Sequence, residues 1–195
     1  MKGFLLVVDG IDGCGKSTQI NHLAKWLPTS GLMPNGANLY VTREPGGTKL
    51  GNALRQLLLK TSKATAPEPI AELLLYAADR AQHISQIIQP ALAKGDWVLS
   101  DRFSGSTTAY QGYGRGLDID FLERLNNFSV KNIVPSLTFL LDINMDEYKI
   151  RMKDKIVDRM ESAGQEFMDR VRSGYLDISK KFSSRICVLD GTENR

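Results

Sequence analysis

The chain has few cysteines, few aromatic residues and no long apolar run. Its 195 residues include two cysteines, Cys14 and Cys187, too few for a disulfide framework or a cysteine zinc site. No apolar run reaches the roughly 18 residues of a membrane-spanning helix, and Met1–Gly3 lead into an apolar segment without space for a signal peptide. The net charge of +3 does not by itself favour nucleic acid. These absences predict a cytoplasmic protein with no membrane and no nucleic acid among its partners.

Apolar material is sufficient for one folded domain, because 42% of the residues are hydrophobic and 24% are charged. Short apolar runs alternate with helical patterns along the chain. We therefore expect residues 1–195 to form a single α/β domain of three layers, a five-stranded parallel sheet with helices on both faces. The expected strands are Phe4–Asp9, Leu39–Arg43, Trp97–Asp101, Leu137–Asp142 and Ile186–Leu189.

Residues 10–17 read G-I-D-G-C-G-K-S, the full G-x-x-x-x-G-K-[ST] pattern of a phosphate-binding loop. The pattern follows an apolar run and precedes a helical one, as a P-loop NTPase fold requires. Lys16 is expected between the β- and γ-phosphates, and the Ser17 hydroxyl on Mg²⁺. The alternative is a chance match in a glycine-rich turn. Cys14 is expected to be a small residue that fits the loop, and the less favoured alternative is a thiol activated by positive charge.

Charged residues close several of the expected strands. Asp9, Arg43, Asp101 and Asp142 all fall at carboxyl ends, so they should approach the edge of the sheet at which ligands bind. Asp101 can hold Mg²⁺, and the adjacent Arg102 can clamp a phosphate. The alternative is a salt bridge of Asp101 with Arg102 or Arg43.

A helix is expected over residues 68–89, with Pro90 ending or kinking it near Gln89. Its apolar stripe is expected to be buried and consists of Ile70, Leu73, Leu74, Ala77, Ala81, Ile84 and Ile88. Glu72, Tyr76, Asp79, Arg80 and His83 fall on the opposite side. That side is either a solvated face or a platform on which an aromatic ring and an arginine meet a planar base.

Three further segments have residue patterns typical of a turn, a nucleoside pocket and a lid. In Thr42–Thr48, proline and glycine impose a sharp loop, and Thr48 can cap a helix starting near Lys49. Ser104–Gln111 is dense in hydroxyls, which suits either a nucleoside pocket or a capped helix start. A basic run continues into Asp158-Arg159-Met160-Glu161, so residues 149–162 are expected to form a lid over phosphates, with an exposed helix as the alternative. The basic residues are Lys149, Arg151, Lys153, Lys155 and Arg159.

Taken together, these motifs resemble the thymidylate kinase family, whose members phosphorylate dTMP to dTDP with ATP. The resemblance spans nearly the whole chain and includes the order and spacing of the phosphate loop, Arg43–Thr48, Asp79-Arg80, Asp101-Arg102-Phe103, the Ser106 to Gln111 block and Asp158-Arg159. It implies a cytoplasmic homodimer that uses Mg²⁺, with ATP as co-substrate.

The resemblance also implies roles for individual positions. It assigns ATP binding to Gly10, Ile11, Asp12, Gly13, Cys14, Gly15, Lys16, Ser17 and Thr18. It assigns dTMP binding to Asp12, Arg43, Glu44, Tyr76, Arg80, Arg102, Thr107, Tyr110 and Gln111, with Arg43 and Arg102 on the phosphate and Tyr76 stacked on the base. The metal falls to Ser17 and Asp101, and catalysis to Lys16, Arg102, Arg151 and Asp12. Position 13 is glycine, so the loop supplies no arginine, and Arg151 is expected to supply the transition-state cation, with Lys153 or Lys155 as substitutes.

Other functions stay open from the residues alone. The nearest is a P-loop kinase of another nucleoside monophosphate. A GTPase-like switch is less favoured because the chain has no Asn-Lys-x-Asp guanine-reading motif. A structural protein that keeps the loop for stability is disfavoured because so many charged strand ends are costly without a ligand.

Overall fold

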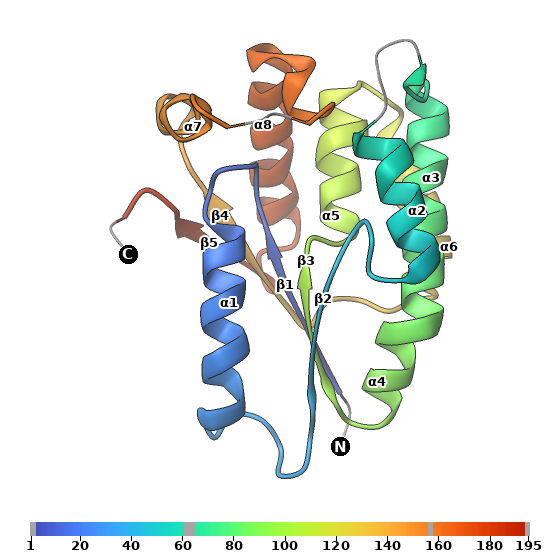
Figure 1. Cartoon of the computed structure of the whole chain (residues 1–195), viewed down its shortest axis with the longest axis vertical. Helices are drawn as coiled ribbons and strands as arrows, with labels where there is room; N and C mark the ends of the chain where they lie inside the picture. The colour runs from blue at the N-terminus through green and yellow to red at the C-terminus, as the bar shows by residue number, and fades with distance from the viewer. Residues whose placement is uncertain (1–2, 61–64, 156–157, 194–195) are drawn as a thin grey trace.

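A computed structural model describes residues 3–60, 65–155 and 158–193 of the chain. Its centre is a five-stranded parallel sheet with the strand order β2-β3-β1-β4-β5 (Figure 1). The predicted α/β architecture is confirmed, and the predicted bounds hold for the first four strands, while the fifth is one residue longer. The strands are β1 (Phe4–Asp9), β2 (Leu39–Arg43), β3 (Trp97–Asp101), β4 (Leu137–Asp142) and β5 (Ile186–Asp190).

The helices fall on the two faces of this sheet. They are α1 (Lys16–Trp26), α2 (Lys49–Leu59), α3 (Pro69–His83), α4 (Gln89–Ala93), α5 (Ser104–Thr107), α6 (Ile119–Val130), α7 (Met145–Met152) and α8 (Gln165–Lys181), with short segments η1 (Leu27–Thr29), η3 (Ile84–Ile88), η4 (Thr108–Gly114) and η5 (Glu161–Ala163). Figure 1 shows α1 on one side of the sheet and α3, α5, α6 and α8 on the other. Among the described residues, no helix combines the length and apolarity needed to cross a membrane.

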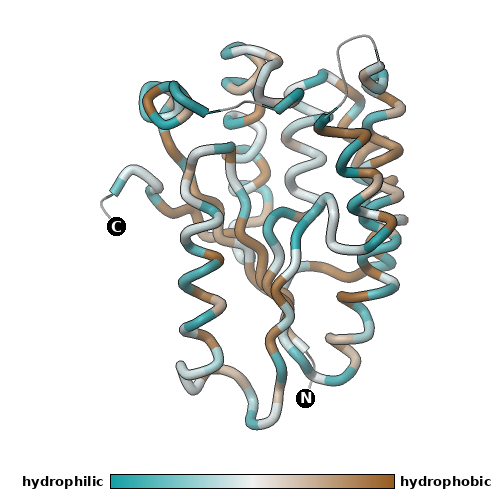
Figure 2. Tube along the Cα trace, in the orientation of Figure 1, coloured by the Kyte–Doolittle hydropathy of each residue, from teal (hydrophilic) through white to brown (hydrophobic). Residues whose placement is uncertain are grey.

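The core follows from the alternation of side chains along β1. Leu6 and Val8 pack in the cluster that holds Ile20 of α1, whereas Leu5 and Val7 pack with Ile84 and Ile88 on the other face. Figure 2 shows the apolar residues gathered along the strands, with hydrophilic residues on the outer turns of α1. Both faces of the central strand are therefore buried, as expected for a parallel sheet with helices on both sides.

The register brings the charged strand ends to one edge but divides them between the two faces. Asp101 pairs with Val8 on one side and with Arg43 on the other. Asp9 is the next residue after Val8, so its side chain points to the opposite face of the sheet. Asp101 and Arg43 therefore lie on the α1 side, and Asp9 lies on the side covered by α8.

Helix α3 confirms one part of its predicted buried stripe and corrects another. Leu73, Ala77, Ile84 and Ile88 are buried, but Ile70 is 62% exposed and Leu74 is 50% exposed. The polar side also turns inward, because its charged groups find partners on neighbouring elements. Glu72, Asp79, Arg80 and His83 are all at most 1% exposed. The solvated-face interpretation is therefore wrong for this helix.

Two boundary predictions around the helices have different outcomes. Thr48 caps α2 as expected, because its hydroxyl accepts the N–H of Gly51 at 2.9 Å. The chain does not leave the helical conformation at Pro90. It widens into the π-helical segment η3 and continues as α4, so the distortion that proline demands falls in the turn before it.

Candidate active site

The loop between β1 and α1 has the geometry of a phosphate cradle. Gly10 has φ +137°, and a Cβ there would lie 2.4 Å from the carbonyl oxygen of Leu141. Gly15 adopts φ +103° at the start of α1, a conformation that favours glycine. The loop therefore delivers its backbone to the N-terminus of α1, where N–H groups and the helix dipole favour an anion.

Lys16 lies inside this loop and is 7% exposed. Its ammonium donates to the carbonyl oxygens of Gly10 at 3.1 Å and Ile11 at 2.9 Å, and lies 3.4 Å from a carboxylate oxygen of Asp12. These contacts hold the charge at the centre of the cradle, which is where a β- or γ-phosphate would meet it.

Cys14 has the structural role expected of it. Its side chain is 2% exposed, and burial raises the pKa of its thiol. A raised pKa opposes formation of the thiolate, so the reactive-thiol alternative is wrong. Cys187, on the edge strand β5, is exposed.

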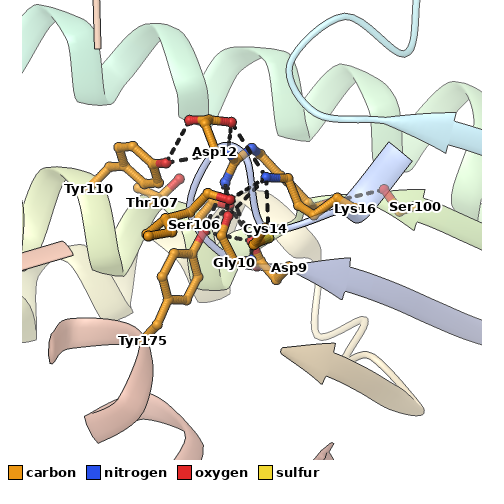
Figure 3. A network of polar contacts seen from close by, with 12 residues as sticks. Asp9, Gly10, Asp12, Cys14, Lys16, Ser100, Ser106, Thr107, Tyr110 and Tyr175 are labelled. Carbon is orange, nitrogen blue, oxygen red and sulfur yellow. Dashed lines mark hydrogen bonds and ion pairs between the residues drawn. The ribbon is translucent and has the colours of Figure 1, made fainter. Parts of the chain in front are cut away.

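Arg102 joins the loop to residues on the far side of the sheet edge. Figure 3 shows its partners gathered at one place, namely Gly10, Asp12, Ser106, Tyr110 and Tyr175. Its guanidinium donates to Asp12 at 2.6 Å, to the carbonyl of Gly10 at 2.9 Å and to the hydroxyl of Tyr175 at 3.0 Å. Its own φ is +68°, in the left-handed region that a non-glycine residue seldom adopts. The alternative interpretation, a salt bridge of Asp101 with Arg102 or Arg43, is absent among the ion pairs of the described residues, since Arg102 pairs with Asp12 and Asp9 instead.

The pKa values of Asp9 and Asp12, the two carboxylates near this cation, shift in opposite directions. Burial by itself raises the pKa of Asp12, but the charges of Arg102 and Lys16 outweigh it and hold that pKa well below its ordinary value. Asp9 is more completely enclosed, and burial raises its pKa despite Arg102 and the hydroxyls of Tyr175 and Ser106, which donate at 2.6 and 2.7 Å. Asp12 is therefore the firmly charged partner of Arg102.

A small cavity opens beside Arg102, with a volume of about 80 Å³. It gathers eight of the nine predicted dTMP-binding residues, from α3, α5, η4 and the segments that follow β1, β2 and β3. These are Asp12, Glu44, Tyr76, Arg80, Arg102, Thr107, Tyr110 and Gln111. Nucleotide pockets are usually several hundred cubic ångströms, so side chains must move apart to admit an acceptor. We refer to this space as the acceptor cavity.

Arg43 is the predicted residue that does not line the acceptor cavity. It lines a neighbouring depression instead and donates to Asn52 at 3.4 Å. Arg55 of α2 does line the cavity, and it donates to the carbonyl of Pro45 at 2.9 Å. The sequence signal for Arg55 was its place one turn after Gly51, on the side of α2 that packs inward.

Arg80 reaches the acceptor cavity as the centre of a buried network. It donates to Glu44, Asn126 and Thr107, each at 2.9 Å, and is 1% exposed. His83 also contacts Glu44, at 2.9 Å. Sequence reasoning missed Asn126 and His83 as supports of this arginine. Two of the five guanidinium N–H groups remain for other partners, so the predicted contact of Arg80 with the base stays a prediction.

Asp79→Asn should reduce the pH dependence of stability in this network. Burial, and next the charge of Glu44, raise the pKa of Asp79 to about 6 from an ordinary 3.8. The folded state therefore binds this proton more tightly, and the wild-type free energy of unfolding should rise as pH falls from about 6 toward 4, by on the order of 2 kcal/mol. Asparagine can still accept the Gly46 N–H, which lies 3.1 Å from Asp79, but it cannot titrate.

Urea unfolding at several pH values between about 7 and 4 measures this effect. The matched control is Asp146→Asn, at a carboxylate that is 91% exposed. Parallel curves for wild type and Asp79→Asn would show that Asp79 does not titrate in this range.

The depression next to Arg43 suits a divalent cation. Ser17 and Asp101 line it, and its volume is about 350 Å³. One carboxylate oxygen of Asp101 is buried and, among the described residues, is the buried side-chain atom with no hydrogen-bond partner. Oxygen ligands at two positions fit a cation that takes most of its shell from water and nucleotide phosphates.

The expected lid segment meets both the loop and α2. Arg151, in the last turn of α7, donates to the carbonyls of Gly13 at 3.1 Å and Gly191 at 2.9 Å. Farther along, Arg159 donates to the carbonyl of Leu58 at 2.8 Å, and Asp158 and Met160 line the acceptor cavity. Lys153 and Lys155 are exposed. Residues 156–157 of the expected lid lie outside the described residues.

Comparison with known proteins agrees with this geometry. The family model described as thymidylate kinase matches residues 8–195. A thymidylate kinase from Prochlorococcus marinus (strain MIT 9303) is 56% identical over 183 residues, 94% of this chain and 85% of that protein. Another, from Synechococcus sp. (strain CC9605), is 54% identical over 180 residues, 92% of this chain and 86% of that protein.

Solved structures give the same result. A crystal structure of thymidylate kinase from Ehrlichia chaffeensis superposes with a TM-score of 0.79 at 35% identity, covering 97% of this chain and 93% of that one. The phosphate loop, the cavity that collects the predicted acceptor residues, and these matches lead to one conclusion: the chain belongs to the thymidylate kinase family.

Proposed function

We propose that this chain transfers the γ-phosphoryl group of ATP to dTMP, giving ADP and dTDP. The observation that carries the proposal is the position of Asp12, which contacts Lys16 at 3.4 Å and Arg102 at 2.6 Å. The phosphate loop and the acceptor cavity therefore meet at one carboxylate. Phosphoryl transfer needs this arrangement, with donor and acceptor placed end to end and their charges neutralised. The names of the relatives support dTMP as the acceptor.

The proposed chemistry relies on position and charge. The attacking group is a phosphate oxygen of dTMP that is already anionic, so no carboxylate is assigned as a base. Lys16 neutralises the donor phosphates, Arg102 receives the acceptor phosphate, and Asp12 fixes both cations. The base side is assigned to Tyr76, Arg80, Thr107 and Gln111, and the ring of Tyr110 is assigned to crowd a 2′-hydroxyl.

The proposed metal is Mg²⁺, held through Ser17 and Asp101. Held there by Ser17 and Asp101, Mg²⁺ would neutralise the charge of the donor phosphates. The unpartnered oxygen of Asp101 supports this assignment. Excess chelator should abolish turnover, and added Mg²⁺ should restore it.

A coupled assay of ADP release tests the proposed function. Purified protein with Mg·ATP is given dTMP, dUMP, the ribose analogue of TMP or AMP. We expect dTMP to be the preferred acceptor and the ribose analogue to be disfavoured by Tyr110. A clear preference for AMP would instead indicate the rival kinase of another nucleoside monophosphate, and no release with dTMP would contradict the proposal.

Arg151→Ala should lower kcat by about 100-fold or more, because an arginine aimed at the transferring group is worth that much or more in related reactions. The KM for dTMP should change far less, since Arg151 contacts Gly13, Glu147 and Gly191, none of which lines the acceptor cavity. Steady-state kinetics measure both constants. Lys149→Ala, on the same helix and half-exposed, is the control. If Arg151→Ala, Lys153→Ala and Lys155→Ala all turn over normally, none of them supplies the cation.

The remaining assignments concern assembly and location. We assign residues 1–195 to a single domain with a lid over about 149–162, in a cytoplasmic homodimer. Exposed apolar residues on the adjacent helices α2 and α3 support the homodimer, since Leu57 and Leu74 are each 50% exposed and Ile70 is 62% exposed. Light scattering tests it, and a monomer at micromolar concentration would contradict it.

A further inference from the structure

Glu72 is a fully buried carboxylate to which none of the assignments above gives a role. It lies in the first turn of α3 and is 0% exposed. A buried carboxylate persists only where charged or hydrogen-bonding partners compensate for its lost hydration. Its partners therefore show which parts of the molecule it holds together.

Two segments that are distant from α3 in the sequence meet at this carboxylate. From η4, the Gln111 side-chain amide donates to Oε1 at 2.8 Å. Arg115, just after η4, donates to Oε1 at 3.3 Å and to Oε2 at 3.2 Å. From the lid, Arg159 donates to Oε2 through a short bond. One acidic side chain thus connects the lid to the wall of the acceptor cavity.

The contact with Arg159 holds the lid at a defined place. The same guanidinium donates to the carbonyl of Leu58 near the end of α2, so it spans from α3 to α2. Its two sequence neighbours, Asp158 and Met160, line the acceptor cavity. Figure 1 shows the described residues that lead into α8, from Asp158 onward, near the top of the molecule beside α5. Release of Arg159 would therefore free the part of the lid that closes the cavity.

The contact with Gln111 fixes the direction of an amide. A carboxylate accepts hydrogen bonds and cannot donate them, so the Gln111 nitrogen must face Glu72. The carbonyl oxygen of Gln111 is then presented as an acceptor. Gln111 lines the cavity, and the N3–H of thymine is a donor at the base edge. Glu72 can therefore set which polar atom of Gln111 meets the base.

We propose that Glu72 is a positioning residue that couples base recognition to lid closure, by holding Arg159 over the acceptor cavity and orienting the amide of Gln111. This inference rests on the proposed function, since it takes dTMP as the acceptor. Glu72 acts through Arg159 and Gln111 and does not itself line the acceptor cavity.

The test breaks the contact from both ends. Arg159→Gln removes the lid partner and leaves Glu72 paired with Arg115, so the fold is preserved. Glu72→Gln removes the negative charge, and with it the ion pair to Arg159 and the fixed orientation of the Gln111 amide. Arg115→Gln removes the other cation from the same carboxylate and leaves the ion pair between Glu72 and Arg159 in place; the contact with the lid that it loses is a weak one, to the sulfur of Met160 at 3.5 Å. Glu68→Gln changes an exposed acid at the start of the same helix.

We expect Arg159→Gln to raise the KM for dTMP by about 10-fold, with the KM for ATP within about twofold, because the lost contact positions the acceptor side. Glu72→Gln should raise the KM for dTMP at least as much. The double variant should raise this KM no further than Glu72→Gln alone, since each substitution removes the same contact between Glu72 and Arg159. Arg115→Gln should lower the melting temperature with a smaller change in KM, and Glu68→Gln should match wild type.

Limited trypsin digestion gives a second readout that does not depend on turnover. Cleavage after the exposed Lys153 and Lys155, followed by mass spectrometry, reports lid mobility in the presence of dTMP and a non-hydrolysable ATP analogue. Arg159→Gln and Glu72→Gln should be cut there several-fold faster than wild type, whereas Arg115→Gln should not.

The outcomes separate the two proposals. Wild-type protein that does not phosphorylate dTMP contradicts the proposed function. Active wild type, with unchanged KM and lid cleavage in Arg159→Gln, contradicts the coupling alone. Equal effects of Arg115→Gln and Arg159→Gln on KM and cleavage would show that Glu72 only neutralises buried cations.

Discussion

Lys16→Met should lower kcat by about 10³-fold while the protein stays folded, since removing one charge-stabilising donor from a preorganised site costs roughly that much. Methionine matches the four-atom stem of the lysine side chain and lacks only the terminal ammonium. That ammonium sits between the carbonyls of Gly10 and Ile11, at the point where the loop turns toward α1. Its removal leaves the donor phosphates without their fixed cation in the transition state.

Stability should change little in this variant, because Asp12 keeps its contact with Arg102. Steady-state kinetics and thermal unfolding measure the two effects separately. Lys25→Met, at the exposed end of the same helix, controls for the loss of one positive charge. Retention of more than about a tenth of the wild-type kcat would show that Lys16 is not the principal cation on the donor phosphates.

Arg102→Lys should be the most disruptive conservative change, lowering kcat/KM for dTMP by about 10³-fold and also lowering stability. A single ammonium cannot replace a fork that meets Asp12, Gly10 and two tyrosine hydroxyls at once. Lysine keeps the charge, so the loss of stability should stay below the roughly 3–5 kcal/mol that follows removal of one partner from a buried ion pair. The acceptor phosphate would also lose the two-pronged contact that orients it.

The loss of stability in Arg102→Lys should depend on pH, because the charge of Asp12 does. The wild-type pKa of Asp12 is depressed, since the charges of Arg102 and Lys16 outweigh burial. Its contribution to stability is therefore present above its ordinary pKa of about 3.8 and is lost as pH falls below that value. Lysine keeps a positive charge beside Asp12 but loses the two-pronged hydrogen bonding, so in Arg102→Lys part of this acid-sensitive stability should already be missing at neutral pH.

The control for Arg102→Lys is Arg172→Lys, because Arg172 also makes a two-pronged pair, with Asp142 at 2.7 and 2.8 Å, and its side chain is 30% exposed against 15% for Arg102. That change should cost less than about 1 kcal/mol. Equal losses in the two lysine variants would mean that the fork geometry of Arg102 has no special role.

The sheet could be predicted from the sequence because each strand is a short apolar run closed by a polar or charged residue. The phosphate loop could be predicted because its glycines and Lys16 have fixed spacing. The faces of α3 could not. Helical periodicity separates Ile70 and Leu74 from Glu72 and Arg80, but it does not say which side meets the rest of the protein.

The supports of the candidate site were also beyond sequence reasoning. His83 and Asn126 contact the Glu44–Arg80 pair from different elements, and only the folded chain brings them together. The contact of Arg159 with Glu72 spans 87 positions along the chain. Such long-range pairs leave no local pattern, whereas caps such as Thr48 do.

The unequal burial of the two sulfur atoms makes this protein convenient for site-specific labelling. Cys14 is sealed within the phosphate loop, whereas Cys187 is open on the edge of the sheet. A maleimide dye added to the native protein would therefore attach at one defined position and leave the loop unmodified. Fluorescence experiments on the lid can then begin from the unmutated chain, without removal of a competing thiol.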